Sequence, residues 1–596
     1  MKIKHLFGLA VIAAMTASCS SNEDLGTAGP GTGTNETGVG YATFTINLPS
    51  TNGTRADGDP TYAQGTADEY DVNDVTLLIF QKTATSKSEG DYTFVDIAEL
   101  GNMAPWKDEN NSGGITASAT ITAKLNNVAL TGEGSTSDYY ALAILNNKNS
   151  KGEDKITLPT LPTSSTTSST TPPVTYGSWN AASNAHEAKF KDNTKGFYMA
   201  NAPVFVAGGE PTTLVNIDKV YATKQKAETN AATTIHVERG LAKVSIASNA
   251  FPSTALKPTG TKYHEDEVKI TAWNLDVTNK STFPIHKTAG LKNTNFPSIW
   301  SNTTSTSGAS VTRFVDGSNP SFKRVHWGVD PNYNSDDLTT VPNCKGAFNI
   351  LDPNAEINGT ATEPQYCLEN TFDIEHMKQG QTTRVVFKAT YKPNGFTAGE
   401  TFYKIGNSTD LWNETNLIAQ ITAKAADVLG VASSAITVDL DATANDIKNN
   451  AGTKLLVEDN VKNGGTAVSA TEIAKINEKL GLKKTAGTDP IVGIATYKSG
   501  ESYYIARIKH FGDLTPWTEG QETYGKNNDE NNTKYLGRYG VLRNNWYELS
   551  IGSVSGPGTP DVPTIKPTEP DDESYKYISV SVKILSWAKR SQEVEL

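Results

Sequence analysis

Two side chains near the N-terminus could take part in covalent chemistry: a cysteine that could be acylated and an arginine that could direct proteolysis. Cys19 follows three small residues, as cleavage by a lipoprotein signal peptidase requires. Such signals prefer leucine where Thr16 stands, so an ordinary signal with an incidental cysteine stays an alternative. Arg55 is the first arginine of the chain and follows a turn-rich stretch, so we predict cleavage between Arg55 and Ala56.

The first 18 residues have the layout of a lipoprotein signal peptide. Lys2 and Lys4 give it a positive start, and the apolar run at residues 6–17 is too short to span a bilayer. Palmitate and further acyl chains on Cys19 would anchor the precursor stably to a membrane. No aspartate directly follows Cys19, which is typical of lipoproteins that are sent on to the outer membrane and the cell surface.

Cys344 and Cys367 are the remaining cysteines, and in an exported chain they could form a disulfide. Two buried thiols are the alternative, and the sequence leaves both open. The chain has no CxxC motif, so we predict no structural zinc site and no other bound metal.

The common catalytic motifs are absent from the sequence. The eight histidines are scattered without an HExxH motif, and the chain lacks GxSxG, a P-loop and a GxGxxG that precedes a helix. We therefore predict that the protein is not an enzyme and needs no cofactor. The net charge of −12 argues against a nucleic-acid partner, because basic side chains must neutralise phosphates.

A strand is predicted directly before Arg55, at residues 41–48. Phe44, Ile46 and Leu48 share one face of it, and threonine and asparagine side chains share the other, which is typical of a half-buried strand. A Gly- and Thr-rich tether at residues 26–40 precedes the strand. Cleavage after Arg55 would therefore make this strand removable.

Further runs with strand composition are separated by turn-rich stretches, which favours antiparallel sandwiches over βαβ units. These runs are residues 75–81, 139–145, 196–205, 238–246, 268–275, 383–391, 503–508 and 546–551. Alanine-rich residues 416–429 and residues 471–482 are predicted to be helices inserted in loops.

The C-terminus has a spacer followed by a strand. Residues 556–574 contain five prolines in 19 residues, which predicts an extended, semi-rigid segment that spans roughly 60 Å. In the run that follows, the side chains of one face are Ile578, Val580, Val582 and Ile584. A terminal strand on a long spacer is poorly placed to be a core strand of its own domain, so it is a candidate donor strand.

Several segments beyond Cys19 and Arg55 complete a recognisable order along the chain. They are HVERGLAKV (236–244), HWGVDPNY (326–333), QYCLENTF (365–372), YKSGESYYIARIKHFGD (497–513), GRYGVLRNNWYELSIGSVSGPGTP (537–560) and VKILSWAKRSQEVEL (582–596). In this order and spacing, and over nearly the whole chain, they resemble the lipoprotein fimbrillins of Bacteroides-type type V pili, specifically the major subunits of short fimbriae. Thr16 is the departure from that pattern.

The resemblance implies a route from precursor to filament. The precursor would be lipid-anchored in the outer membrane, and an arginine-specific protease would cut after Arg55 so that Ala56 starts the mature subunit. The cut would release the first strand, and the C-terminal strand of another copy would replace it, which builds a head-to-tail filament at the cell surface. Accessory anchor and tip subunits, and ligands on host or bacterial surfaces, would be further partners.

We expect a mainly β chain with two transthyretin-like antiparallel β-sandwich domains, long loops, small helical insertions and a C-terminal donor strand. The predicted parts are a signal at 1–18, a propeptide at 19–55, domains at 56–235 and 236–555, and the spacer and donor strand at 556–596. One alternative is a tip or accessory subunit of the same filament. Another is a surface glycan-binding lipoprotein, although the nine tryptophans do not cluster into an aromatic platform.

Overall fold

The computed structural model describes most of the chain and leaves several segments out. The described residues are 39–48, 69, 71–102, 118–161, 173–182, 190, 195–205, 211–247, 251, 254–288, 324–325, 327–333, 335–372, 376–483, 492–510, 537–571 and 578–586. Cys19, Arg55 and Ala56 lie outside these ranges, so the lipidation and cleavage predictions fall where the structure describes nothing.

The first unit is one continuous sheet in the order β3-β2-β5-β6-β8-β1-β4, with β7 paired to β5. Its strands are β1 (Gly40–Asn47), β2 (Asp74–Gln81), β3 (Thr93–Asn102), β4 (Ser118–Leu125), β5 (Tyr139–Leu145), β6 (Met199–Asn201), β7 (Val215–Asn216) and β8 (Thr233–Arg239). Alternate side chains from both halves of the sheet enter one apolar cluster, which includes Phe44, Leu77, Ala143 and Ile235. Three short helices lie around it: η1 (Glu89–Asp91), α2 (Tyr176–Ala182) and α4 (Lys224–Glu228).

The second unit has two sheets that share one apolar cluster. One sheet has the order β10-β14-β22 and the other the order β13-β9-β23-β24. Their strands are β9 (Leu241–Ile246), β10 (Glu267–Asp276), β13 (Gln365–Leu368), β14 (Arg384–Lys392), β22 (Glu501–Arg507), β23 (Asn545–Val554) and β24 (Ile578–Ser586). Val244, Phe387 and Tyr547 come from different strands of the two sheets and meet in this cluster. A short pair, β11 (Thr278–Asn279) with β12 (Phe348–Asn349), and α5 (Val341–Ala347) complete the unit.

A third unit, here called the lobe, is inserted between residues 402 and 497 and has its own apolar cluster. It contains β15 (Phe402–Ile405), β16 (Leu411–Trp412), α6 (Glu414–Leu429), η5 (Ser433–Ala435), β17 (Ile436–Val438), β18 (Gly452–Lys454), η6 (Glu458–Asn460), β19 (Val461–Asn463), β20 (Thr466–Ala467), α7 (Ala470–Lys479) and β21 (Ile494–Tyr497), and η7 (Lys498–Gly500) follows it. The two predicted helices are α6 and α7, so that prediction is confirmed.

The ends of α6 follow from its sequence. The Asn413 side chain accepts a hydrogen bond from the backbone N–H of Asn416, and Gly430 ends the helix with φ +65°. Leu417, Ile421 and Ala425 recur at the spacing of one helix face, and all three are buried in the lobe. The lobe is thus built as a small core of its own rather than as a surface loop.

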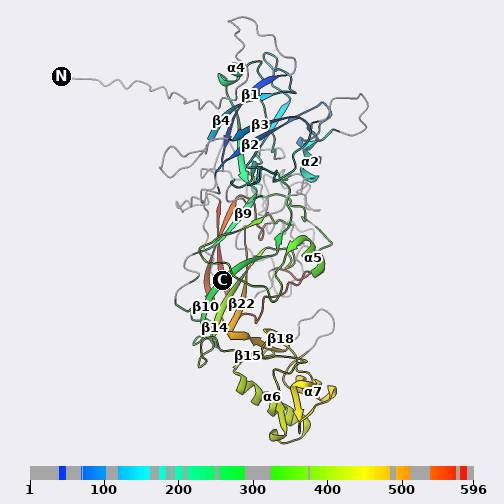
Figure 1. Cartoon of the computed structure of the whole chain (residues 1–596), viewed down its shortest axis with the longest axis vertical. Coiled ribbons are helices and arrows are strands. Elements are labelled where there is room, and N and C mark those ends of the chain that lie inside the picture. The colour runs from blue at the N-terminus through cyan, green and yellow to red at the C-terminus, as the bar shows by residue number, and fades with distance from the viewer. Residues whose placement is uncertain are drawn as a thin grey trace, which may run out of the picture.

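The units follow one another along a long axis. Figure 1 shows the β1–β4 region at one end, the sheets of the second unit in the middle, and α6 and α7 at the opposite end. Within the described residues, no helix is long and apolar enough to cross a membrane.

The mainly β fold class with small helical insertions is confirmed, and most predicted strands lie where expected. Residues 196–205 are an exception, because only Met199–Asn201 is a strand there. The predicted domain boundary after Ile235 falls inside β8, which pairs with β1 and β6 over residues on both sides of that position. Strand β8 therefore belongs to the first sheet as far as Arg239, and the chain enters β9 across Gly240.

The cysteine alternative that the structure supports is the pair of thiols. Cys344 packs against Val277 and Ile565, whereas Cys367 lies in β13 within the shared cluster of the second unit, and no disulfide joins them. Burial raises the pKa of the Cys344 thiol to about 11, so this side chain stays protonated at neutral pH. Of the two possibilities that the sequence leaves open, the structure therefore has the two buried thiols rather than the disulfide.

The predicted spacer is also corrected in part. Residues 556–571 pack along the second unit, and Val562 and Ile565 within them are buried. Proline composition favours an extended backbone, but it does not show whether the residues between the prolines find partners. This segment, here called the strap, is therefore not a freely extended linker.

Candidate functional site

The predicted removable strand lies inside the first sheet rather than at its edge. Strand β1 pairs with β4 antiparallel along its whole length, from Gly40 opposite Leu125 to Asn47 opposite Ser118. On its other side it pairs parallel with β8, from Phe44 to Asn47. Removal of β1 would thus free the hydrogen-bonding groups of two strands at once.

The inward face of β1 is buried. Phe44 and Ile46 have no exposed surface and Leu48 is 6% exposed. These three predicted side chains, with Ala42, belong to the apolar cluster that also holds Ile235 of β8 and Leu125 of β4. Burial of a large apolar side chain contributes about 1.5–3 kcal/mol, so β1 supplies a substantial share of this core.

The other face of β1 is held by hydroxyl pairs. The Thr43 and Thr45 hydroxyl oxygens lie 2.9 and 3.0 Å from those of Thr122 and Thr120 on β4. At the start of the strand, Tyr41 and Tyr221 exchange two backbone hydrogen bonds of 2.7 and 2.8 Å. These polar pairs fix the register, because a shift by one residue would turn Phe44 and Ile46 away from the core.

The predicted donor strand is β24, at the edge of a sheet in the second unit. It pairs antiparallel with β23, so that positions 578, 582 and 584 lie opposite Val554, Leu549 and Tyr547, which are buried. Position 580 lies opposite Ile551. Among the strands that the structure describes, β24 has a neighbour on one side only, so it can separate from its sheet without breaking a second described ladder.

The four-strand arrangements around β1 and β24 have the same pattern. The neighbours β6-β8-β1-β4 are joined by antiparallel, parallel and antiparallel pairing, and so are β13-β9-β23-β24. Thus β24 occupies in the second unit the position that β4 occupies in the first. The two predicted strands lie in different units, and the structure does not bring them together within one chain.

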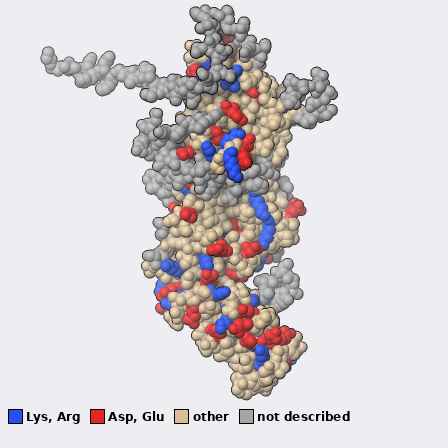
Figure 2. All heavy atoms as spheres, viewed as in Figure 1, with Lys and Arg blue, Asp and Glu red and all other residues tan. Residues whose placement is uncertain are grey.

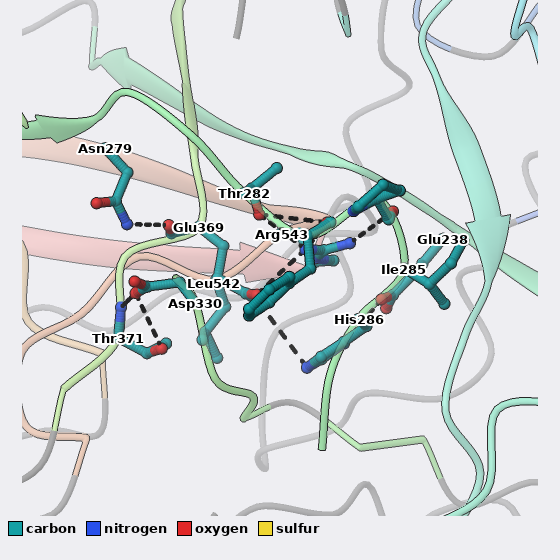
Figure 3. A network of polar contacts seen from close by, with 12 residues as sticks. Glu238, Asn279, Thr282, Ile285, His286, Asp330, Glu369, Thr371, Leu542 and Arg543 are labelled. Carbon is teal, nitrogen blue, oxygen red and sulfur yellow. Dashed lines mark hydrogen bonds and ion pairs between the residues drawn. The ribbon is translucent and has the colours of Figure 1, made fainter. Parts of the chain in front are cut away.

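A buried polar network connects the first and second units, and it is not among the predicted sites. Figure 3 shows that Glu238, at the end of β8, faces His286 of the second unit. One carboxylate oxygen of Glu238 lies 2.8 Å from Nδ1 of His286, and the other lies 2.8 Å from Nη2 of Arg324. Burial raises the pKa of the Glu238 carboxyl, but His286 and Arg324 lower it by more, so the pKa is below its usual range.

The same network continues on the other side of His286. Its Nε2 lies 3.8 Å from a carboxylate oxygen of Glu369, whose other oxygen lies 3.3 Å from Nη2 of Arg543. Arg543 also donates to Thr282 Oγ1 at 3.0 Å and to two backbone carbonyls. Acidic and basic side chains thus alternate through the contact between the units (Figure 3).

A second set of buried contacts centres on Glu69, the first described residue after the predicted cleavage point. Its carboxylate lies 2.7 Å from Nζ of Lys243 on β9 and accepts a hydrogen bond of 2.5 Å from Tyr366 on β13. Its carbonyl accepts one of 2.6 Å from Nε of Arg239 on β8. Burial lowers the pKa of Lys243, and Glu69 opposes that shift. We call these contacts and the Glu238–Arg543 network together the joint.

The joint is formed by residues that are far apart in the sequence. Its partners are separated by up to about 300 positions, so no local sequence periodicity predicts that they are in contact. The one sequence signal was the HVERGLAKV segment, which contains Glu238, Arg239 and Lys243. Gly240 lies between them because a Cβ there would be 2.6 Å from the ring of Phe190.

The surface charge has no single sign on the face that Figure 2 shows. Basic and acidic side chains are interspersed over the described residues of that face, and acidic side chains gather toward the end formed by the lobe.

The comparisons with known proteins concern mainly the C-terminal part of the chain. Residues 495–593 match the family described as "Major fimbrial subunit protein type IV, Fimbrillin, C-terminal". That range contains β22, β23, the strap and β24. This match supports the predicted resemblance to fimbrillins over those residues. No curated protein matches the chain.

Three of the solved structures that match this chain are distant from it in sequence. A putative cell adhesion protein from Parabacteroides distasonis is 11% identical with a TM-score of 0.34, and the match covers 93% of this chain and 99% of that one. A fimbrilin from Porphyromonas gingivalis is 11% identical with a TM-score of 0.33, over 92% and 99%. A putative cell adhesion protein from Bacteroides eggerthii is 14% identical with a TM-score of 0.29, over 94% and 99%.

Proposed function

We propose that this chain is a shaft subunit of a cell-surface fimbria, activated by proteolysis after Arg55 and polymerised by donor-strand exchange. The observation that carries the proposal is the position of β1. It lies between β4 and β8 with Phe44 and Ile46 fully buried, and it ends at Asn47, eight residues before Arg55 in the sequence.

Loss of β1 creates a site that is specific for a strand. The edges of β4 and β8 face each other with unpaired N–H and C=O groups, and the floor between them is apolar. An incoming strand with alternating apolar residues satisfies both features, because main-chain hydrogen bonds give affinity and side-chain pockets give register. The uncut precursor is its own plug, which keeps it monomeric before export.

The segment that fills the site in the next subunit is the strand with Ile578, Val580, Val582 and Ile584. Four such side chains contribute on the order of 6–12 kcal/mol before the costs of association. Each ladder hydrogen bond adds roughly 0.5–1.5 kcal/mol. The contact is head-to-tail and does not close on itself, so repetition gives a fibre.

Possession of both a removable strand and a donor strand favours the shaft over the end of the filament. A subunit at the end of a filament needs only one of the two. We expect accessory anchor and tip subunits to be partners of the filament. We also expect the filament to mediate adhesion to surface ligands.

The remaining proposed steps are the lipid anchoring of the precursor and its release. Cys19 carries lipid and holds the precursor in the outer membrane, and cleavage after Arg55 discards it with residues 19–55. Ala56 then becomes the first residue of the mature subunit, so the finished filament is free of the anchor. The chain acts as a structural protein and performs no catalysis.

The test is assembly of purified protein. The chain without its signal is treated with an arginine-specific protease, and SDS-resistant ladders and filaments are sought by gel and by electron microscopy. We expect wild type to assemble, Arg55→Ala to stay uncut and monomeric, and a variant lacking residues 575–596 to be cut yet stay monomeric.

Two results would contradict the proposal. If the truncated chain forms normal filaments, β24 is not the donor strand. If Arg55→Ala forms normal filaments, cleavage after Arg55 is not the activating step. Arg313→Lys serves as a control because position 313 is far in the sequence from β1, the cleavage point and β24, and this variant should be cut at the same position as wild type.

A further inference from the structure

We propose that the strap, residues 556–571, stays bound to its own subunit when β24 is donated, and that the Arg507–Asp571 ion pair is the fixed root of the donor arm. This inference rests on the proposed function, since it concerns the reach of the same donor strand. The moving arm is then residues 572–596 rather than the whole proline-rich C-terminus.

The strap is bound to β22 and its neighbours near its start. Thr559 and Tyr503 exchange two backbone hydrogen bonds of 2.9 Å each. Gly558 donates its N–H to Ser502 Oγ at 2.9 Å and accepts from the Tyr497 hydroxyl at 2.8 Å. A Cβ at Gly558 would lie 2.0 Å from the Tyr503 carbonyl oxygen, so glycine permits this close approach.

The middle of the strap is held by burial. Val562 is 1% exposed and packs with Val386 and Tyr503, while its N–H donates to the Pro353 carbonyl at 3.2 Å. Ile565 is 4% exposed and packs with Cys344 in a separate cluster. The strap thus fills two apolar pockets of its own subunit, and its removal would open both.

The end of the strap is fixed by charge and by backbone pairing. Asp571 is buried, its N–H donates to the Met377 carbonyl at 3.0 Å, and its carboxylate pairs with Arg507 at the end of β22. One residue earlier, Pro570 forms a bridge with Lys378. Loss of one partner from a buried ion pair is strongly destabilising, so the position of Arg507 favours retention of Asp571.

This arrangement divides the C-terminus by strength of attachment. The strap uses hydrogen bonds, two buried side chains and a buried ion pair, whereas β24 is an edge strand with one ladder. Only seven chain steps separate Asp571 from Ile578, which reach roughly 25 Å at most when extended. The accepting sheet of the next subunit must therefore approach the Arg507 end of β22, rather than lie anywhere within the longer reach of a free spacer.

Two engineered disulfides test the strap and the moving arm independently. The strap lock is Lys378→Cys with Pro570→Cys, which replaces a bridged pair at the root. The arm lock is Ser550→Cys with Ser581→Cys, which are opposite in the β23–β24 register. Facing residues of antiparallel strands lie within the Cα separation that a disulfide allows. Both variants are made in the chain without its signal and Cys19, and thiol titration verifies each bond.

Each variant is cut by the arginine-specific protease and assembled with and without reductant. We expect the arm lock to abolish filaments until reductant is added, and the strap lock to assemble as wild type in both conditions. Loss of assembly in the oxidised strap lock would overturn the inference while the proposed function stands. Normal assembly of the oxidised arm lock would overturn the donor assignment itself, and the inference with it.

A second measurement uses wild-type protein and avoids new cysteines. The backbone N–H groups of Thr559 and Val562 are hydrogen-bonded within the subunit, so their deuterium exchange should be as slow in filaments as in the precursor. Fast exchange of these two amides in filaments would show that the strap is released, which would overturn the inference.

Discussion

Asp330 lies beside the joint, where burial and hydrogen bonding act on its charge in opposite directions. Its carboxylate accepts hydrogen bonds of 2.6 Å from the Thr371 N–H and 2.7 Å from the Asn332 N–H (Figure 3 shows the first of these). Burial raises the pKa of this carboxyl to about 7, the two N–H groups oppose the shift, and nearby Glu369 adds to it. The folded protein therefore binds this proton more tightly than the unfolded chain does.

The sign of the pH effect follows from that raised pKa. The stability contributed by protonated Asp330 is fully present below the ordinary pKa of 3.8 and is lost as pH rises through about 7. Asp330→Asn removes this dependence, so the free energy of unfolding of the variant relative to wild type should increase by on the order of 2–4 kcal/mol between pH 4 and pH 8. Urea unfolding of the precursor at several pH values measures it.

Asp138→Asn is the matched control, because that side chain is exposed. Its stability relative to wild type should change little over the same pH range. A constant difference between Asp330→Asn and wild type from pH 4 to pH 8 would contradict the raised pKa.

The sequence pattern predicted the buried face of β1 because its signal is local. The alternation of Phe44, Ile46 and Leu48 predicts which face of β1 is buried, and all three are buried. Glu69 could not be found in this way. Its partners Lys243 and Tyr366 come from strands far along the chain, and only the folded sheets bring them together.

At the level of elements, the strands were predictable and the strap was not. Period-2 alternation within a run of residues indicates a strand whatever it packs against. The five prolines of the C-terminal segment indicate backbone extension only. Whether Val562 and Ile565 between them are buried depends on pockets formed by residues such as Val386 and Val277, which composition does not reveal.

We expect the lobe to unfold as a cooperative unit separate from the second unit. Ile421 of α6 is fully buried in a cluster that the sheets of the second unit do not share. Ile421→Ala should destabilise the lobe by about 2–5 kcal/mol, because it removes buried methyl groups and leaves a cavity. Hydrogen exchange should then speed up in α6 and α7 while β10 and β14 keep their protection.

Ala419→Ser is the control for that variant, since position 419 is on the exposed face of the same helix. It should leave exchange in the lobe close to that of wild type. Equal acceleration in α6 and β14 for Ile421→Ala would mean that the lobe and the second unit unfold together.

For the whole molecule, the joint decides whether the first and second units behave as one body. The apolar contact there includes Phe197 and Tyr198 of the first unit with Leu241 and Leu368 of the second. The charged contacts restrict how the two units can be oriented across this apolar contact, because each carboxylate lies next to a specific basic side chain. In the proposed filament such a contact would limit bending within each subunit, because domains without a large apolar interface move relative to one another.

Glu69 is the residue at which this rigidity can be tested. Glu69→Ala leaves Lys243 buried without its carboxylate and Tyr366 without its acceptor, so we expect a loss of about 3–5 kcal/mol in the free energy of unfolding. The double variant Glu69→Leu with Lys243→Met replaces the pair by apolar groups and should recover most of that loss. Urea unfolding measures both, with exposed Glu133→Ala as control. If Glu69→Ala unfolds at the same urea concentration as Glu133→Ala, the ion pair does not hold the units together, and the rigidity of the joint must come from the apolar contact alone.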